Sequence, residues 1–235
     1  MSGGAGFSQK EGASLPPSLP RGRHRLSRGE VAADQRRRLL AAMTESVAVR
    51  GYAATSVERV IELAGVSRAT FYEQFGNRRE CLLAAHAAVL ERFLEDVSAA
   101  CSGETVWRDR AAAAIGAAVE FAIRHPDEAR LLALDTIAAD AEAARHALAG
   151  ADRLVAMLRT GRKHHTQAAD LPEVTERALV GAVASAVNWH LLKGESLRGL
   201  EPQLIYLVLT PYVGSAAAAR QAARVEKSAG GSSPR

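Results

Sequence analysis

Residues 51–75 read GYAATSVERVIELAGVSRATFYEQF, and this stretch decides the fold. Its apolar residues recur at spacings of three and four up to Gly65, which predicts a short helix that ends sharply there, because glycine takes the positive φ of such an end. We expect Thr55 and Glu58 to form the capping box that starts this helix. Ser67 predicts the start of a second short helix, since serine accepts hydrogen bonds from the free N–H groups of a first turn.

The second helix has one apolar side and one side with chemistry suited to DNA. Phe71 and Phe75 are four residues apart and therefore face the core together. Small, polar and cationic residues remain outward. A supporting helix, a glycine-containing turn and a short exposed helix form the arrangement that reads a major groove.

The outward residues divide by the part of DNA that each one suits. Arg68 can donate two hydrogen bonds to a guanine edge, Ala69 can approach a thymine methyl group, and Thr70 can contact a base or a phosphate. Free N–H groups at two helix starts add anion sites. The candidate contacts to phosphate there and nearby are Ser56, Ser67, Tyr72 and Gln74.

Upstream of this motif, Ser27 and Glu30 predict a capping box for a helix that runs over residues 28–50 and stops at Gly51. Residues 1–26 are rich in Gly, Ser and Pro, and we expect a disordered arm. Its basic end, residues 21–25, either tracks phosphates or enters a minor groove. The alternative is a solvated tail without a role in binding.

Downstream of residue 76, Ala-rich patterns of helical period continue almost to the end, and strand-like alternation is absent. The fold class is therefore predicted to be all-α, with about nine helices. We expect a helix-turn-helix domain over residues 27–76, with the motif at 56–75. A long helix then joins it to a helical bundle over residues 77–220, and a disordered tail covers 221–235.

Charge is distributed unevenly over the 235 residues, whose formal net charge is +4. Residues 1–80 hold 13 Lys and Arg against 8 Asp and Glu, whereas the remainder holds 17 against 18. This asymmetry favours a polyanionic partner for the N-terminal third.

Several other classes of protein are disfavoured by what the sequence lacks. Cys81 and Cys101 lie at opposite ends of one expected helix, roughly 30 Å apart, so they are expected to be reduced thiols. No apolar stretch is long enough to span a bilayer, and a cytoplasmic protein without a membrane partner is expected. No spacing indicates a metal site, a cofactor or catalysis, and the histidines are interpreted as surface residues.

Residues 27–83 resemble the DNA-binding domain of TetR-family (TetR/AcrR-type) regulators. The resemblance rests on GYAATSV at 51–57, AGVSRATFYEQF at 64–75 and GNRRECLLAA at 76–85. It implies base contacts from the start of the second helix and phosphate contacts around it. Arg78 is implied as a further phosphate contact, at a position where the family commonly has lysine.

The resemblance also implies a homodimer that binds a pseudo-palindromic double-stranded operator and responds to a small-molecule effector, most simply as a repressor. Residues 124–126, 171–192 and 210–214 resemble an actinobacterial branch, in which the last two long helices form the dimer interface. Here these would cover residues 172–193 and 202–220. The alternatives are an architectural DNA-binding protein without ligand control, or an enzyme whose site carries no motif.

Candidate ligand contacts are Phe121, Asp135 and Asn188, because bundles place ligands between facing helices and two of these residues interrupt apolar runs. The alternative for Asp135 and Asn188 is a surface position or pairing with a neighbouring helix. For Phe121, Trp107 and Trp189 the alternative is an ordinary place in the core or an interface.

Overall fold

The computed structural model describes residues 27–230, and this part of the chain consists of helices joined by turns and loops, without a strand. The predicted all-α class, with about nine helices, is confirmed by ten α-helices within the described residues. The predicted arm at 1–26 and residues 231–235 lie outside the described residues.

The helices occur in the following order: α1 (Arg28–Ala54), α2 (Val57–Ala64), α3 (Arg68–Gln74), α4 (Arg78–Cys101), α5 (Trp107–Arg124), α6 (Pro126–Arg130), α7 (Ala141–Arg159), α8 (Thr175–Lys193), α9 (Leu200–Val213) and α10 (Ser215–Gly230). A π-helical segment, η1 (Leu131–Asp135), follows α6, and two 3-10 turns, η2 (Thr160–Lys163) and η3 (Thr166–Ala168), precede α8.

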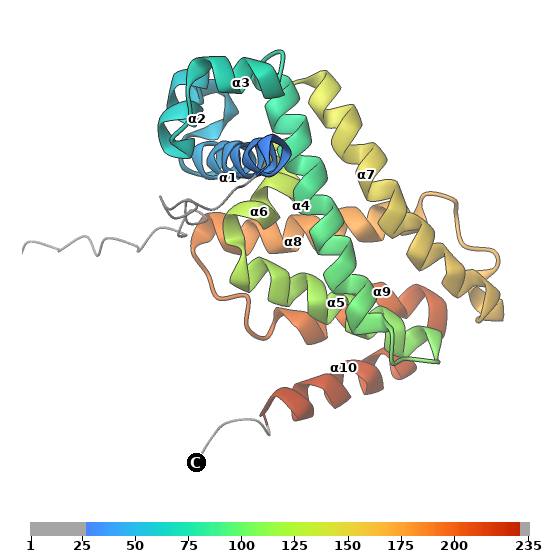
Figure 1. Ribbon diagram of the computed structural model, residues 1–235. Coiled ribbons are helices and arrows are strands. Elements are labelled where there is room, and N and C mark those ends of the chain that lie inside the picture. The colour runs from blue at the N-terminus through green and yellow to red at the C-terminus, as the bar shows by residue number, and fades with distance from the viewer. Residues whose placement is uncertain (1–26, 231–235) are drawn as a thin grey trace, which may run out of the picture.

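The three N-terminal helices gather at one end of the molecule (Figure 1). The predicted capping box at Ser27 and Glu30 is present, and the chain leaves ideal helical geometry at Gly51, where φ is 74° and ψ is 160°. One further turn follows this kink before α1 ends at Ala54.

The predicted capping box between Thr55 and Glu58 is wrong. The side chain of Ser56 caps α2 by accepting a hydrogen bond from the backbone N–H of Arg59 at 3.2 Å. Thr55 is instead buried, and its hydroxyl donates to the carbonyl of Gly51 at 3.0 Å. The kink at the end of α1 therefore draws Thr55 inward and leaves the next residue to start the helix.

Helix α4 joins the two ends of the molecule. Its N-terminus is capped by Asn77 and follows α3 after a short link. Its body runs down past α5 and α7 (Figure 1). Cys81 and Cys101 are both in this helix and are unpaired. The bundle is completed by helices α5, α7, α8 and α9. No described helix combines the length and the apolarity needed to cross a membrane.

The C-terminal helices differ from the expected boundaries. Instead of one helix over 202–220, α9 ends at Val213, because Gly214 takes a φ of 77°, and α10 then runs to Gly230. The expected tail at 221–235 is therefore helical through residue 230. Ala222 packs into the core, and Gln221 donates to Asp109 at 2.8 Å, so tertiary contacts stabilise this helix.

Candidate functional site

The turn between α2 and α3 has the geometry that the sequence predicts. Gly65 is left-handed, with φ 61° and ψ 41°, and its N–H donates to the backbone carbonyl of Glu62 at 3.2 Å. Ser67 then caps α3 by accepting from the N–H of Thr70 at 3.0 Å. A residue with a Cβ would be strained at Gly65, so the angle between the two helices depends on this glycine.

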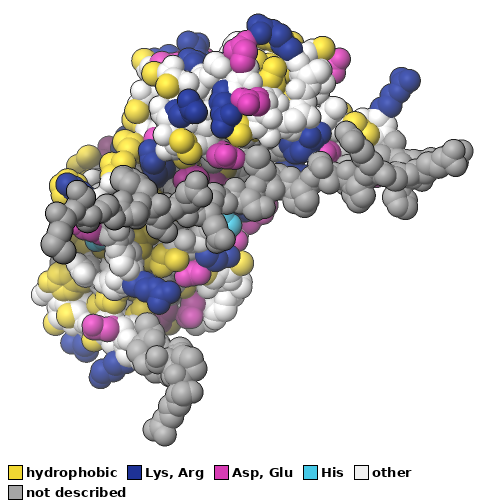
Figure 2. Space-filling model, turned by 90° about the vertical axis from the view of Figure 1, so that its left-hand side faces the viewer, with side chains coloured by type: hydrophobic (Ala, Val, Ile, Leu, Met, Phe, Trp, Pro, Cys, Tyr) yellow, Lys and Arg dark blue, Asp and Glu magenta, His cyan; other side chains and the backbone are white. Residues whose placement is uncertain are grey.

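One face of α3 is anchored in the core and the other is exposed. Phe71 is fully buried, Phe75 is nearly so, and their ring centroids are 5.7 Å apart. The predicted DNA contacts lie on the opposite side: Ser56, Ser67, Arg68, Ala69 and Tyr72 are exposed, and Thr70 and Gln74 are half-buried. We call this set the α3 surface. Figure 2 shows basic side chains over the upper end of the molecule, interspersed with acidic ones.

Two arginines of α1 fix the C-terminal ends of α2 and α3. Arg38 donates to the carbonyl of Ala64 at 2.7 Å and to the buried carboxylate of Asp34 at 3.1 Å. Arg36 donates to the carbonyl of Gln74 at 3.3 Å and lies over the ring of Phe75. Because neither short helix has a basic residue in its own last turn, these cations satisfy the terminal carbonyls and the helix dipoles.

Arg78 lies differently from the other predicted DNA contacts. Its guanidinium donates to the carbonyl of Thr55 and lies 4.2 Å from the ring centroid of Tyr52. The half-buried side chain therefore joins the start of α4 to the end of α1. A contact between Arg78 and phosphate, which the resemblance predicted, would have to replace or add to these internal contacts.

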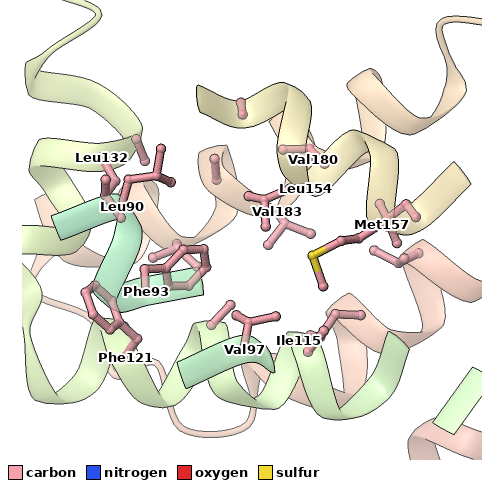
Figure 3. Close-up of a pocket in the computed structure, with 18 of the residues that line it drawn as sticks. Leu90, Phe93, Val97, Ile115, Phe121, Leu132, Leu154, Met157, Val180 and Val183 are labelled. Atoms are coloured by element: carbon pink, nitrogen blue, oxygen red, sulfur yellow. The ribbon is translucent and has the colours of Figure 1, made fainter. Parts of the chain in front are cut away.

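A cavity of about 430 Å³ lies between α4, α5, α7 and α8 (Figure 3). Its walls are mostly aliphatic and aromatic, which favours apolar ligands. The side chains labelled in Figure 3 are Leu90, Phe93, Val97, Ile115, Phe121, Leu132, Leu154, Met157, Val180 and Val183.

The three predicted ligand contacts are placed differently with respect to this cavity. Phe121 lines it and packs against Phe93, with ring centroids 5.2 Å apart. Asp135 and Asn188 are buried but are not among the lining residues. Asp135 instead pairs with Arg130 at 3.4 Å, which is the pairing with a neighbour that the sequence left open.

His86 lines the cavity, and sequence reasoning missed it. It is 2% exposed, so its interpretation as a surface residue is wrong. Burial, and then the nearby His146, lower the pKa of His86 to about 4. The available signal was its register, because His86 follows Leu82 by four residues and precedes Leu90 by four, on the buried side of α4.

The cavity and the N-terminal helices are connected through two structural links. The first is α4, whose N-terminus adjoins α3 and whose body lines the cavity. The second is Arg130, which donates to the carbonyl of Ala48 in α1 at 3.0 Å and directly precedes η1. Since Leu132 in η1 also lines the cavity, a change in the cavity can act on α1 as well as on α4.

Comparison with known proteins gives matches to bacterial transcription regulators. Residues 39–85 match the family model described as "Bacterial regulatory proteins, tetR family". The HTH-type transcriptional activator FasR of Mycolicibacterium smegmatis is 30% identical over 128 residues, which span 54% of this chain and 56% of FasR. The alignment therefore covers little more than half of that relative.

Solved structures share the fold over most of their length. The fatty acid degradation regulator FadR from Bacillus halodurans superposes with a TM-score of 0.66 at 18% identity, covering 74% of this chain and 94% of FadR. FadR from Bacillus subtilis, in complex with stearoyl-CoA, gives 0.63 at 18% identity, covering 75% and 97%. A TetR-like regulator from Rhodococcus sp. RHA1 gives 0.64 at 20% identity, covering 79% and 97%.

Proposed function

We propose that the chain is a transcriptional regulator of the TetR type that binds an operator through its α3 surface, and that a small molecule in the cavity releases it. The α3 surface offers the outward residues that major-groove reading needs. Arg68, Ala69 and Thr70 read bases, and Ser56, Ser67, Tyr72 and Gln74 contact phosphates.

The position of helix α4 between α3 and the cavity is the observation that supports control of DNA binding by a ligand. Asn77 caps it shortly after the end of α3, and six of its residues between His86 and Cys101 line the cavity farther along. A ligand that prefers one tilt of α4 thereby changes the placement of α3. A 100-fold loss of operator affinity requires a coupling free energy of about 2.7 kcal/mol between the two sites.

The cavity supports an effector that carries a long apolar chain. Its volume of about 430 Å³ lies in the range of small-molecule pockets, and its labelled walls are hydrocarbon side chains apart from one thioether. The Bacillus subtilis FadR, which shares this fold, was solved with stearoyl-CoA. We therefore propose an acyl or alkyl compound as the effector, with Phe121 as a wall; contacts from Asp135 and Asn188 would require the ligand to reach beyond the lining residues.

A homodimer is the proposed active form, because one short recognition helix reads only a half-site. Helix α8 exposes Trp189 and Leu192, and α9 exposes Tyr206 and Leu207. Large exposed apolar side chains of this kind mark interaction surfaces. Two copies joined through α8 and α9 would place two α3 helices about one DNA turn, roughly 34 Å, apart.

The test is a titration with a cavity-filling variant. The operator is first selected from random DNA, and its affinity for the protein is measured by fluorescence anisotropy with and without stearoyl-CoA. Ala118 lines the cavity, so Ala118→Trp is expected to keep operator binding and lose release by the acyl compound. Ala149→Trp is the control, because Ala149 is exposed and outside the lining.

Two other results would change the proposal. Equal affinity for all DNA sequences would indicate an architectural protein. FasR is described as an activator, which favours activation as the second candidate. A reporter gene behind the selected operator distinguishes the two, because loss of a repressor raises expression and loss of an activator lowers it.

A further inference from the structure

We propose that Arg110 binds an anionic end group of the effector, and that the effector is an alkyl carboxylate whose chain fills the rest of the cavity. The inference rests on the proposed function and deepens it, because the proposed function assigns only the apolar chain. It also predicts the direction of the ligand, with the carboxylate at the end of the cavity where α4 ends and α5 begins.

The first argument is the position of Arg110 in the lining. Helix α5 faces the cavity with Trp107, Ala111, Ala114 and Ala118, which recur at three- and four-residue spacing. Arg110 lies on the same face, three residues after Trp107 and four before Ala114. In the described part of the chain, Arg110 is the one lining residue with a permanent charge, and no acidic residue lines the cavity. A ligand therefore meets one cation in this wall.

The second argument is that the guanidinium is unpaired and accessible. Within residues 27–230, the side chain of Arg110 has neither a hydrogen bond nor an ion pair. Arg108 and Arg124 of the same helix, by contrast, pair with carboxylates. Arg110 is half-buried, and none of its nitrogens is among the buried atoms that lack a partner. The guanidinium therefore keeps surface that a ligand can reach, and an anion can bind it without breaking an existing ion pair.

The third argument is the sign of the charge that acts on Cys101, which lines the same end of the cavity. Burial raises the pKa of the Cys101 thiol, the charge of Arg110 lowers it, and Glu104 raises it by less than Arg110 lowers it. The guanidinium therefore lies close enough to act on the cavity wall, and its effect there is larger than that of the nearby carboxylate. The same positive charge stabilises an anionic ligand group at this end.

The fourth argument is that this end of the cavity is the more exposed one. Ser98, Met157 and Thr160 line it and are exposed, whereas His86 and Phe121 at the other end are buried. A carboxylate is costly to bury without a partner, so an amphiphilic ligand places its charged group at the exposed end and its chain toward Phe121. The planar guanidinium of an arginine matches a carboxylate there through two parallel hydrogen bonds.

The experiment compares decanoate with decanamide, which have the same shape but differ in charge. Isothermal titration calorimetry on the full chain at pH 7 is expected to show about tenfold tighter binding of decanoate. This is the lower end of the effect of a hydrogen bond between charged groups, because the site is partly exposed.

Three variants test whether Arg110 causes this preference. In Arg110→Met, which keeps an apolar stem, the preference is expected to fall below twofold while decanamide binds as before. Arg110→Lys is expected to keep part of the preference, because it keeps the charge without the planar fork. Arg108→Met is expected to keep all of it, because Arg108 is exposed and outside the lining.

A second measurement follows the ligand itself. The pKa of bound decanoate is measured from the resonance of a ¹³C label at its carboxyl carbon. An apolar cavity alone raises this pKa above its value in water, whereas a guanidinium partner opposes the rise. In the unsubstituted protein the pKa is therefore expected to stay at or below its value in water, and in Arg110→Met it is expected to rise.

The outcomes separate the role of Arg110 from the proposed function. Equal affinity for decanoate and decanamide, or a raised pKa of decanoate bound to the unsubstituted protein, would overturn the role of Arg110 and leave the cavity as a ligand site. Failure of both probes to bind would overturn that role together with the proposed ligand control. The expected preference without release of the operator would support the role of Arg110 and overturn the proposed control.

Discussion

Nη1 of Arg68 lies 2.5 Å from Oε1 of Glu58, so the proposed base-reading side chain forms an ion pair within the protein. Both side chains are 61% exposed. The hydrogen bond from Arg68 helps to lower the pKa of Glu58, after a contribution from the backbone of Glu58 itself. Base reading therefore exchanges one hydrogen-bonding partner of Arg68 for another.

Loss of Arg68 is expected to reduce discrimination more than it reduces general affinity for DNA. Arg68→Ala should weaken operator binding by about tenfold or more and relax preference at one position of each half-site. The measurement is affinity for operator and for random DNA across a salt series. Equal losses for both DNAs, with preference intact, would show that Arg68 contacts phosphate and does not read a base.

Glu58→Gln is also expected to lower operator preference, but with a rise in general affinity for DNA. It removes a negative charge beside the phosphate backbone, so affinity for random DNA should rise by a few fold. It also releases Arg68 from its partner, so operator preference should fall. Anisotropy with both DNAs tests this, and Glu62→Gln serves as control because Glu62 pairs with Arg59. An unchanged ratio of the two affinities would contradict a positioning role for Glu58.

Arg78→Ala is expected to destabilise the N-terminal helices. The substitution removes the hydrogen bond to Thr55 and the stacking on Tyr52, which together should lower the free energy of unfolding by about 1–2 kcal/mol. Urea unfolding measures this, with Arg28→Ala as an exposed control. If stability is unchanged and the salt dependence of DNA binding decreases by about one unit per site, Arg78 is a phosphate contact alone.

His86 is expected to link stability to pH. Its folded-state pKa of about 4 is below the ordinary value of 6.5, so the unfolded chain binds more protons between these values. Stability is complete above pH 6.5 and is lost as the pH falls toward 4, by at most about 3 kcal/mol. The difference between the unsubstituted protein and His86→Phe in urea unfolding should therefore shrink on acidification. A pH-independent difference would show that His86 does not carry this linkage.

Local features were predictable because they depend on residues a few positions apart. The caps at Ser27 and Ser67 and the left-handed turn at Gly65 needed only neighbouring residues, and all three are present. The fold class followed from periodicity. Most residues of the α3 surface followed from the same pattern, although their contacts with DNA stay predictions.

Features that depend on distant parts of the chain could not be predicted in this way. The bond from Arg38 to Ala64 joins residues 26 positions apart, and that from Arg78 to Thr55 joins residues 23 apart. The burial of His86 depends on which helix faces α4. Helix α10 has a polar, Ala-rich sequence, and only its packing against the core distinguishes it from a tail.

On helix α3, the residues that anchor the helix in the core differ from the residues that are proposed to read DNA. Phe71 is its one fully buried side chain, and the guanidinium groups of Arg36 and Arg38 donate to backbone carbonyls at the ends of α3 and α2, whatever side chains α3 carries. Exchanges at Arg68, Ala69 or Tyr72 therefore cost little folding free energy. Operator choice can diverge in evolution, or be redesigned, without a matching change in the scaffold.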